Sequence, residues 1–397
     1  MTDNGAIDDF DTAAPSNVME RETMPEALLV ATRKGLFTYR HDGGTLVLED
    51  TAFLGDPVTI VLRDPRDGAT YAGLNLGHFG CKLHRREADG TWRELTAPAF
   101  PPKPDDAEVV RDPMRGEEVP WKVQQIWALA PDYAQPGALW CGTIPGGLFH
   151  STDRGETWSL NMPLWMLPER AQWGGGGYDW PGIHSIVTHP DHPDRVMVAV
   201  STGGVWRSDD RGLTWRISSQ GMRAEYMPPG QEYDPVAQDA HLMVAGATDP
   251  DVLWVQHHNG IFKSVDGGAA WTEVTSAKPS AFGFAVAVHP ANPDVAWFAP
   301  AIKDERRIPV DGKVVVSRTR DGGASFDVLT QGLPDANAYH LIYRHGLVVS
   351  GVGNGTGAPQ LAMGSTTGSL WTSADEGERW TRVSADLPPI YALHWVG

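Results

Sequence analysis

The sequence predicts an all-β fold, a seven-bladed β-propeller, on two observations. One is a turn motif, Ser/Thr-x-Asp-x-Gly-x-x-Trp/Phe, whose five copies start 57, 56, 55 and 54 residues apart. The other is a similar set of short apolar strands around each copy. Repetition at such a period indicates an array of supersecondary units. The five copies are residues 151–158, 208–215, 264–271, 319–326 and 373–380, and two degenerate copies are residues 85–92 and 39–44.

Each motif is expected to form the tight turn of a β-hairpin. Its Asp and Gly suit the turn backbone, and its aromatic residue fills the interior of the blade. An apolar strand that ends in a Pro-containing turn precedes each motif, as at Thr188-His189-Pro190. Between this turn and the motif lie a second strand, such as residues 196–200, and a third strand that begins with glycine, such as the one at Gly204. Four short strands per repeat of this length predict a propeller blade.

Seven blades require seven innermost strands around the axis. These strands are expected to start near Thr59, Gln125, His184, His241, Phe284, His340 and His394. The last start lies so close to residue 397 that its blade is incomplete, and residues 27–50 are expected to supply the missing strands and close the ring. Residues 26–397 are therefore predicted to form one propeller domain. Residues 1–25 are acidic and poor in apolar side chains, which predicts a disordered tail.

The repeated turn resembles the Asp-box (BNR) repeat of sialidases, xyloglucan-degrading glycosidases, sortilin-type receptors and a photosystem II assembly factor. The resemblance covers about residues 26–397 and implies a propeller, but it implies little about function because the box lies at the outer edge of the blade. Arg307-Ile308-Pro309 resembles the Arg-Ile-Pro motif of sialidases, which have six blades and carry it before the first box. Here it falls in the fifth blade, and we interpret it as coincidence.

Four of the seven expected strand starts are histidines. His184 and His241 each follow their motif start by 33 residues, and His340 and His394 each follow theirs by 21 residues. This spacing predicts four imidazoles that converge on the axis and hold a divalent transition metal, with iron favoured over zinc, copper or manganese. The geometry resembles that of carotenoid cleavage oxygenases, and also the His/Gln manganese site of oligogalacturonate lyases. One side of the metal would stay open for substrate, water or dioxygen.

The longest predicted loops all fall on the face where the innermost strands start, and elaborated loops on one mouth of a scaffold commonly carry function. These loops are rich in aromatic residues, which predicts a small organic and possibly aromatic substrate. The residues expected to contact it are Gln125, His78, His258, Trp180, Tyr178, Phe284, Tyr339 and Arg33.

Composition narrows the classes of partner. The chain of 397 residues carries a formal net charge of −18, which disfavours nucleic acid and anionic membranes. Two cysteines, Cys81 and Cys141, do not suggest a disulfide framework, and neither a signal peptide nor an apolar run of 18 residues is apparent. We expect a cytoplasmic protein. The oligomeric state stays open.

These observations favour a metal-dependent enzyme whose reaction is oxidative cleavage, elimination or hydrolysis, with no catalytic residue assigned. One alternative is an Asp-box glycoside hydrolase, similar to sialidases, that uses mouth carboxylates such as Asp179, Glu225 and Glu232. Another is a non-catalytic propeller scaffold, which predicts a plain channel without metal. The absence of acidic residues from the histidine positions favours the metal enzyme over the glycosidase.

Overall fold

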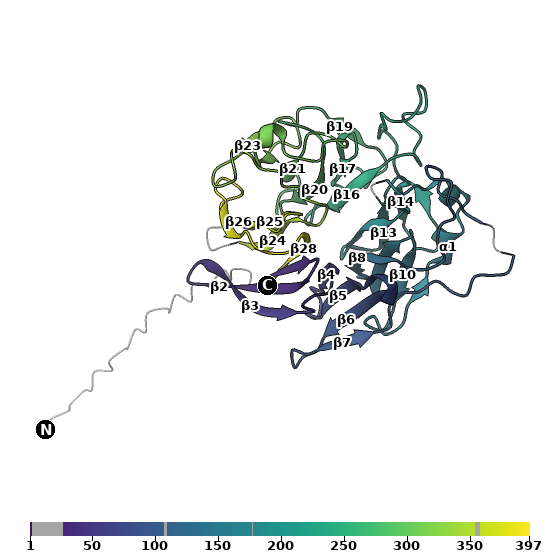
Figure 1. The fold of residues 1–397 in the computed structure, drawn as a ribbon, viewed down its shortest axis with the longest axis horizontal. Coiled ribbons are helices and arrows are strands. Elements are labelled where there is room, and N and C mark those ends of the chain that lie inside the picture. The colour runs from purple at the N-terminus through teal and green to yellow at the C-terminus, as the bar shows by residue number, and fades with distance from the viewer. Residues whose placement is uncertain (2–26, 107–108, 177, 354–357) are drawn as a thin grey trace.

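The predicted seven-bladed propeller is confirmed. A computed structural model describes residue 1 and residues 27–106, 109–176, 178–353 and 358–397. The described residues form seven four-stranded antiparallel sheets. In Figure 1 the ribbon runs from the purple N-terminal strands through teal and green blades and returns in yellow beside the purple strands. The predicted tail, residues 1–25, lies almost wholly outside the described residues.

The strands follow the predicted order of four per blade. The blade that joins the two ends of the chain contains β28 (Ile390–Val396), β1 (Ala27–Thr32), β2 (Gly35–Asp42) and β3 (Thr45–Ala52). The next three blades contain β4 (Val58–Arg63), β5 (Thr70–Asn75), β6 (Cys81–Arg86) and β7 (Trp92–Leu95); β8 (Gln125–Pro131), β9 (Leu139–Ile144), β10 (Leu148–Ser151) and β11 (Ser159–Leu160); and β12 (Ile183–His189), β13 (His192–Val200), β14 (Gly204–Ser208) and β15 (Arg216–Ile217).

The last three blades contain β16 (Ala240–Ala245), β17 (Leu253–His257), β18 (Gly260–Ser264) and β19 (Thr272–Val274); β20 (Gly283–Val288), β21 (Ala296–Pro300), β22 (Val316–Thr319) and β23 (Asp327–Leu329); and β24 (Leu347–Gly353), β25 (Pro359–Gly364), β26 (Leu370–Ser373) and β27 (Thr381–Ser384). Helices are short: α1 (Met162–Trp165) and three 3₁₀ turns, Gly77–Phe79, Pro168–Gln172 and Val310–Gly312. No helix in the described ranges exceeds five residues, which is far too short to cross a membrane.

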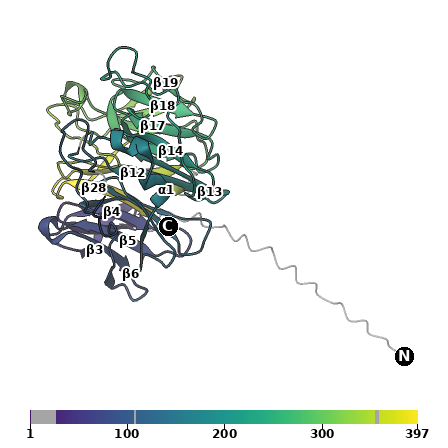
Figure 2. The same ribbon diagram turned by 90° about the vertical axis from the view of Figure 1, so that its right-hand side faces the viewer.

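Ring closure joins the two ends of the chain. Strands β1 and β28 pair antiparallel, with Leu28 opposite Trp395 and Val30 opposite Leu393. Contacts among β4, β8, β12, β16, β20, β24 and β28 complete the ring of innermost strands. Turned by 90°, the molecule shows the sheets of β3–β6 below those of β12–β19 (Figure 2). The predicted pairing of the N- and C-terminal strands is therefore confirmed.

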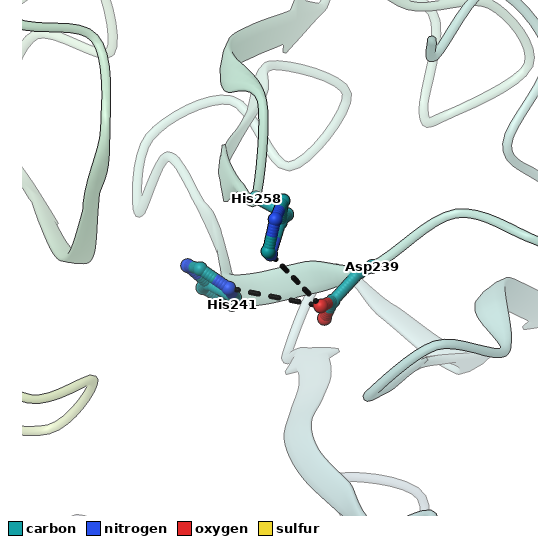
Figure 3. Close-up of side chains that lie close together, drawn as sticks. All are labelled: Asp239, His241 and His258. Carbon is teal, nitrogen blue, oxygen red and sulfur yellow. Dashed lines mark ion pairs between the residues drawn. The ribbon is translucent and has the colours of Figure 1, made fainter. Parts of the chain in front are cut away.

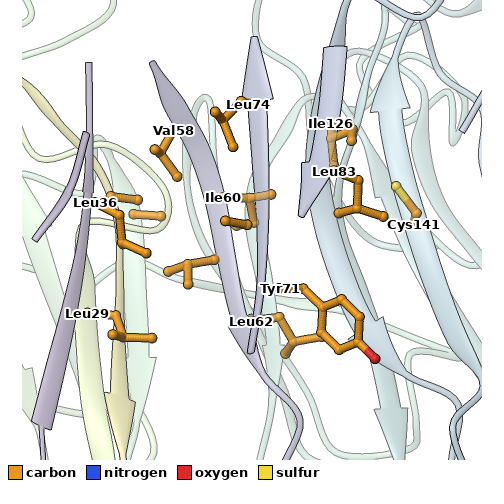
Figure 4. Close-up of a cluster of buried hydrophobic side chains, with 14 of the residues drawn as sticks. Leu29, Leu36, Val58, Ile60, Leu62, Tyr71, Leu74, Leu83, Ile126 and Cys141 are labelled. Carbon is orange, nitrogen blue, oxygen red and sulfur yellow. The ribbon is translucent and has the colours of Figure 1, made fainter. Parts of the chain in front are cut away.

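Hydrophobic side chains fill the space between neighbouring blades. Leu28 and Val30 pack with Leu370 of the preceding blade, and Leu29 packs with Ile60 of the following blade. Figure 4 shows the second of these clusters, which extends through Tyr71 and Leu83 toward Ile126 and Cys141. Each blade thus buries both of its faces, as strands in a closed ring must.

The repeated motif forms the turn between the third and fourth strands of a blade. In the copy at β14, the N–H of Gly212 donates to Ser208 Oγ over 2.7 Å, and Ser208 Oγ donates to Asp210 Oδ1 over 2.8 Å. The same pair of contacts recurs in the other four copies. Gly212 has φ +80°, which explains the glycine at this position.

The innermost strands carry a recurring β-bulge near their starts. Six of them shift register there, and the bulged residues are Thr59, Trp127, His184, His241, Phe284 with its neighbour Ala285, and Tyr391. A bulge bends the strand and re-aims its side chains, and bulges are common next to functional sites. Five of the seven predicted strand starts lie within one residue of the observed starts.

Two predicted starts are wrong. Strand β24 begins at Leu347, seven residues after His340, and β28 begins at Ile390, four residues before His394. The segment before β24 is held by single contacts instead of a ladder, among them a bridge between His345 and Ala392 and a bond from the Leu393 N–H to the His345 carbonyl. Because such a segment has no strand periodicity, counting from the turn motif missed it.

The closing blade predicts a specific sensitivity. Leu28 is fully buried, so Leu28→Ala should lower the free energy of unfolding by about 2–5 kcal/mol, measured by urea denaturation. Val47→Ala in β3 is the matched control, because Val47 is 42% exposed and its truncation should change stability by less than about 0.5 kcal/mol. Equal effects of the two substitutions would contradict the closure.

Candidate functional site

A cavity of about 830 Å³ opens at the mouth of the propeller where the innermost strands start. Its walls come from the starts of β4, β8, β20 and β28, from the segment before β24, and from loops on the same face. The predicted location of the functional face agrees with this cavity. The lining residues are Asp56, Pro57, Thr59, Asn75, Leu76, Gly77, Phe79, Gln125, Trp127, Tyr178, Phe284, Arg307, Tyr343, Arg344, His345 and Tyr391.

Aromatic rings form much of the wall. Trp127 and Tyr178 meet edge to face with centroids 4.7 Å apart, and Phe284 and Tyr343 do so at 5.5 Å. Their positions follow from the bulges, since Trp127, Phe284 and Tyr391 are bulged residues. Rings with polar edges offer flat faces for the apolar side of a ligand and hydroxyls for its polar groups.

Two arginines lie against the same ring in this wall. The guanidinium carbons of Arg307 and Arg344 are 5.4 and 5.5 Å from the centroid of Phe284. Arg307 is bonded to Asp304 through Nε at 2.9 Å. Arg344 is buried and also lies 4.7 Å from the Trp127 ring. The cavity therefore has a cationic side.

Behind this wall, Asp239, His241 and His258 form a group of side chains (Figure 3). Asp239 Oδ2 lies 3.3 Å from His258 Nδ1 and 3.8 Å from His241 Nε2. His241 stacks on Phe284 with centroids 4.4 Å apart, and its Nδ1–H donates to the Gly283 carbonyl over 2.6 Å. That bond leaves Nε2 of the neutral ring as the acceptor that faces Asp239.

Burial and charge set the protonation of this group. Burial opposes ionisation of Asp239, but His241, His258 and Arg344 together hold its pKa well below its usual range. Burial lowers the pKa of His241 to about 3, even though Asp239 acts in the opposite direction. Burial also disfavours the charged form of His258, yet its hydrogen bond to Asp239 raises its pKa. Asp239 is therefore a carboxylate, and His258 is protonated more easily than an ordinary histidine.

The four predicted metal ligands do not meet at one point, and that prediction is wrong. His184 and His241 lie at the starts of β12 and β16, but His394 Nε2 accepts the N–H of Arg63 at the far end of β4. His340 contacts Thr367 and the Trp371 ring in the third strand of its blade. The axis is reached instead by His345, whose Nε2–H donates to the His184 carbonyl over 3.0 Å.

Within the described part of the chain, Asp239, His241 and His258 are the one group with three donors close enough for a metal ion. A carboxylate and two imidazoles are suitable ligands for a divalent transition metal. The positive charge of Arg344 acts on both Asp239 and His241, however, which opposes a second cation in this place.

Of the predicted substrate contacts, Gln125, Tyr178 and Phe284 line the cavity. His78 lies between two lining residues and packs on the Phe79 ring, and His258 belongs to the group around Asp239. Trp180, Tyr339 and Arg33 are not part of the lining, and the side chain of Tyr339 is mostly exposed. The sequence interpretation missed Trp127, Tyr343, Arg344, His345 and Tyr391.

The carboxylates proposed for a glycosidase at the mouth also need correction. Asp179 pairs with Arg115, Glu225 pairs with Arg223, and Glu232 accepts the N–H of Gly230. None of the three is in the described lining. The carboxylates in or beside the wall are Asp56, Asp239 and Asp304, of which Asp56 lines the cavity itself.

Comparison with known proteins finds no matching family model. A xyloglucanase of Paenibacillus sp is 25% identical over 288 residues, which cover 65% of this chain and 26% of the relative. A probable oligoxyloglucan-reducing end-specific xyloglucanase of Neosartorya fischeri is 25% identical over 289 residues, covering 66% and 32%. The chain thus spans about a quarter to a third of the length of these curated relatives. Both relatives are described as xyloglucanases.

Solved structures support the fold. An ancestral GH74 enzyme superposes with a TM-score of 0.53 at 16% identity, over 85% of this chain and 38% of that one. A functionally unknown protein from Desulfotomaculum acetoxidans superposes with a TM-score of 0.54 at 9% identity, over 94% and 99%. Because the relatives are xyloglucanases, the prediction of a four-histidine iron enzyme is wrong. The resemblance to carotenoid cleavage oxygenases is not supported either. The expectation of an enzyme agrees with these relatives.

The buried histidines predict loss of stability in acid. Burial lowers the pKa of His241 and His257 to about 3 and of His345 and His394 to about 4, against 6.5 ordinarily. Below about pH 6.5 the unfolded chain therefore binds protons that the folded protein does not. Each such histidine should lower the free energy of unfolding by about 1.4 kcal/mol per pH unit down to its folded pKa.

Urea denaturation between pH 7.5 and pH 4.5 measures this slope. His394→Gln keeps an acceptor for the Arg63 N–H and removes one titrating group, so it should flatten the slope by about 1.4 kcal/mol per pH unit. Equal stability of the wild-type protein at pH 5.0 and pH 7.5 would refute the assignment of neutral buried imidazoles.

Proposed function

We propose that this chain is a glycoside hydrolase that cleaves an oligosaccharide bound in the cavity at the propeller mouth. The observation that carries the proposal is the sequence relationship to xyloglucanases over about two thirds of the chain. The aromatic wall supports it, because Trp127, Tyr343 and Tyr391 offer ring faces and hydroxyls to a sugar. Xyloglucan oligosaccharides are the first substrates to test.

Hydrolysis of a glycosidic bond ordinarily requires two carboxyl groups, one that protonates the leaving oxygen and one that acts as base or nucleophile. Asp56, Asp239 and Asp304 are the carboxylates in or beside the cavity wall. The second carboxylate is either Asp239, which is buried behind the wall and kept ionised by its neighbours, or Asp304, which pairs with Arg307 beside the cavity. Asp56 lines the cavity itself, and we assign it as the proton donor to the leaving group on this position alone.

The proposal predicts activity without a metal. Release of reducing sugar from xyloglucan oligosaccharides should be the same before and after treatment with a chelator. Asp56→Asn should lower kcat at least about 100-fold, as loss of a general acid does, and Asp239→Asn or Asp304→Asn should do the same for the second carboxylate.

Asp179→Asn is the matched control, because Asp179 is exposed and pairs with Arg115 outside the cavity wall. It should leave kcat unchanged. Full activity of Asp56→Asn would exclude the carboxylate assignment. Loss of activity in chelator, or no cleavage across a broad panel of glycans, would exclude the proposed function.

A further inference from the structure

Arg344 stands apart from the other buried arginines. Arg85 contacts Glu87 and Glu156 at 3.0 and 3.2 Å, and Arg318 contacts Asp327 and Glu378 at 2.9 and 2.6 Å. These pairs satisfy the buried charges, as is usual in folded proteins. Arg344 is only 5% exposed, yet no described residue forms a hydrogen bond or ion pair with its side chain. Nε lacks a partner in both Arg318 and Arg344, but only Arg344 also lacks an ion pair.

The aromatic rings beside Arg344 do not supply the hydrogen-bond acceptors that its guanidinium lacks. Trp127 and Phe284 flank the guanidinium and attract its charge. A guanidinium nevertheless carries five N–H donors in one plane, and ring faces do not replace oxygen acceptors for them. Burial lowers the pKa of Arg344, but an arginine stays protonated in proteins. The donors therefore remain available to a group that enters the cavity.

The surrounding charges leave the cavity side positive. Asp239 attracts Arg344 but is too far away to form an ion pair with it. The ion pairs of Asp239 within 4.0 Å are with His258 and His241. Arg307 is occupied by Asp304 at 2.9 Å and shares the Phe284 ring with Arg344. In a chain with a net charge of −18, a cationic pocket concentrates small anions against the general repulsion.

His345, the residue that follows Arg344, is held by two hydrogen bonds. The N–H of Leu393 donates to the His345 carbonyl over 2.9 Å, and His345 Nε2 is bonded to the His184 carbonyl at 3.0 Å. These contacts tie the segment before β24 to two other blades. With the neighbouring residue fixed and the guanidinium flanked by Trp127 and Phe284, the Arg344 side chain loses little conformational freedom when a ligand binds.

We propose that Arg344 binds a carboxylate on the saccharide ligand, so that the cavity takes an acidic sugar, such as a uronic acid residue, in preference to a neutral one. A carboxylate matches a guanidinium in plane and charge and can accept two parallel hydrogen bonds from it. The aromatic wall then packs against the sugar ring. This inference rests on the proposed function for the kind of ligand, and it adds the charge of that ligand.

Binding can be tested with two disaccharides that differ only in oxidation at C6, cellobiouronic acid and cellobiose, by isothermal titration calorimetry on the full chain. The wild-type protein should bind the acid about 10- to 100-fold more tightly. Added salt should weaken binding of the acid only. Arg344→Met keeps an apolar stem between the two rings and should equalise the two affinities, while Arg344→Lys should keep part of the preference.

Should Arg344→Met fail to fold, the wild-type comparison and the Arg344→Lys variant still decide the question. Equal affinity of the wild-type protein for both disaccharides, or an undiminished preference in Arg344→Met, overturns the inference. Glucose 6-phosphate that binds while the uronate binds no better than cellobiose also overturns the carboxylate assignment.

The two proposals fail separately. Cleavage of neutral xyloglucan oligosaccharides without any preference for the acid overturns this inference and leaves the proposed function standing. Selective binding of the acid, with no glycan cleaved across the panel, supports the inference and overturns the proposed hydrolysis.

Discussion

Pairing between β1 and β28 is the constraint on which the rest of the structure depends. It joins the two ends of the described chain in one sheet and leaves the ring without an open edge. Only a closed ring holds the seven innermost strands around one axis. The cavity then exists because residues far apart in the sequence, such as Thr59, Phe284 and Tyr391, line the same mouth.

Within that ring, the β-bulges decide what faces the cavity. A regular strand would turn alternate side chains to the axis, but the bulge in six of the innermost strands re-aims one side chain at the mouth. In two strands the bulged residue is a histidine that lies behind the wall, and in three it is an aromatic residue that lines it. The resulting cavity has ring faces on several sides and one unpaired guanidinium.

The fold could be predicted from the sequence because its signal is local and repeated. The Ser208, Asp210 and Gly212 contacts of one turn recur in every full copy, so the spacing of the copies reports the blades directly. The closing strand also followed from counting strands. Nothing in this reasoning required knowledge of which side chains touch.

For the site, only its position on the fold could be predicted from the sequence. Gln125, Tyr178 and Phe284 were expected at the mouth and do line the cavity, because the starts of their strands or their long loop could be located by counting from the turn motif. The four-histidine centre was wrong for a physical reason: the segment before β24 leaves the ladder, so His340 turns toward Trp371 and Arg344 takes the place at the mouth. In the sequence, Arg344 also looks like an ordinary surface charge, because the two rings that flank it in space, Trp127 and Phe284, lie far away along the chain. That it forms no ion pair with any described carboxylate is visible only in three dimensions.

The proposed function places the saccharide in the cavity at the mouth. A crystal structure of the Asp56→Asn protein with a bound xyloglucan-derived or uronate-containing oligosaccharide tests it most directly. The account predicts a sugar ring packed against the aromatic wall formed by Trp127 and Tyr343, with any carboxylate at Arg344. A saccharide bound along the outer strands or the turn motifs, with the cavity filled by water alone, would contradict it.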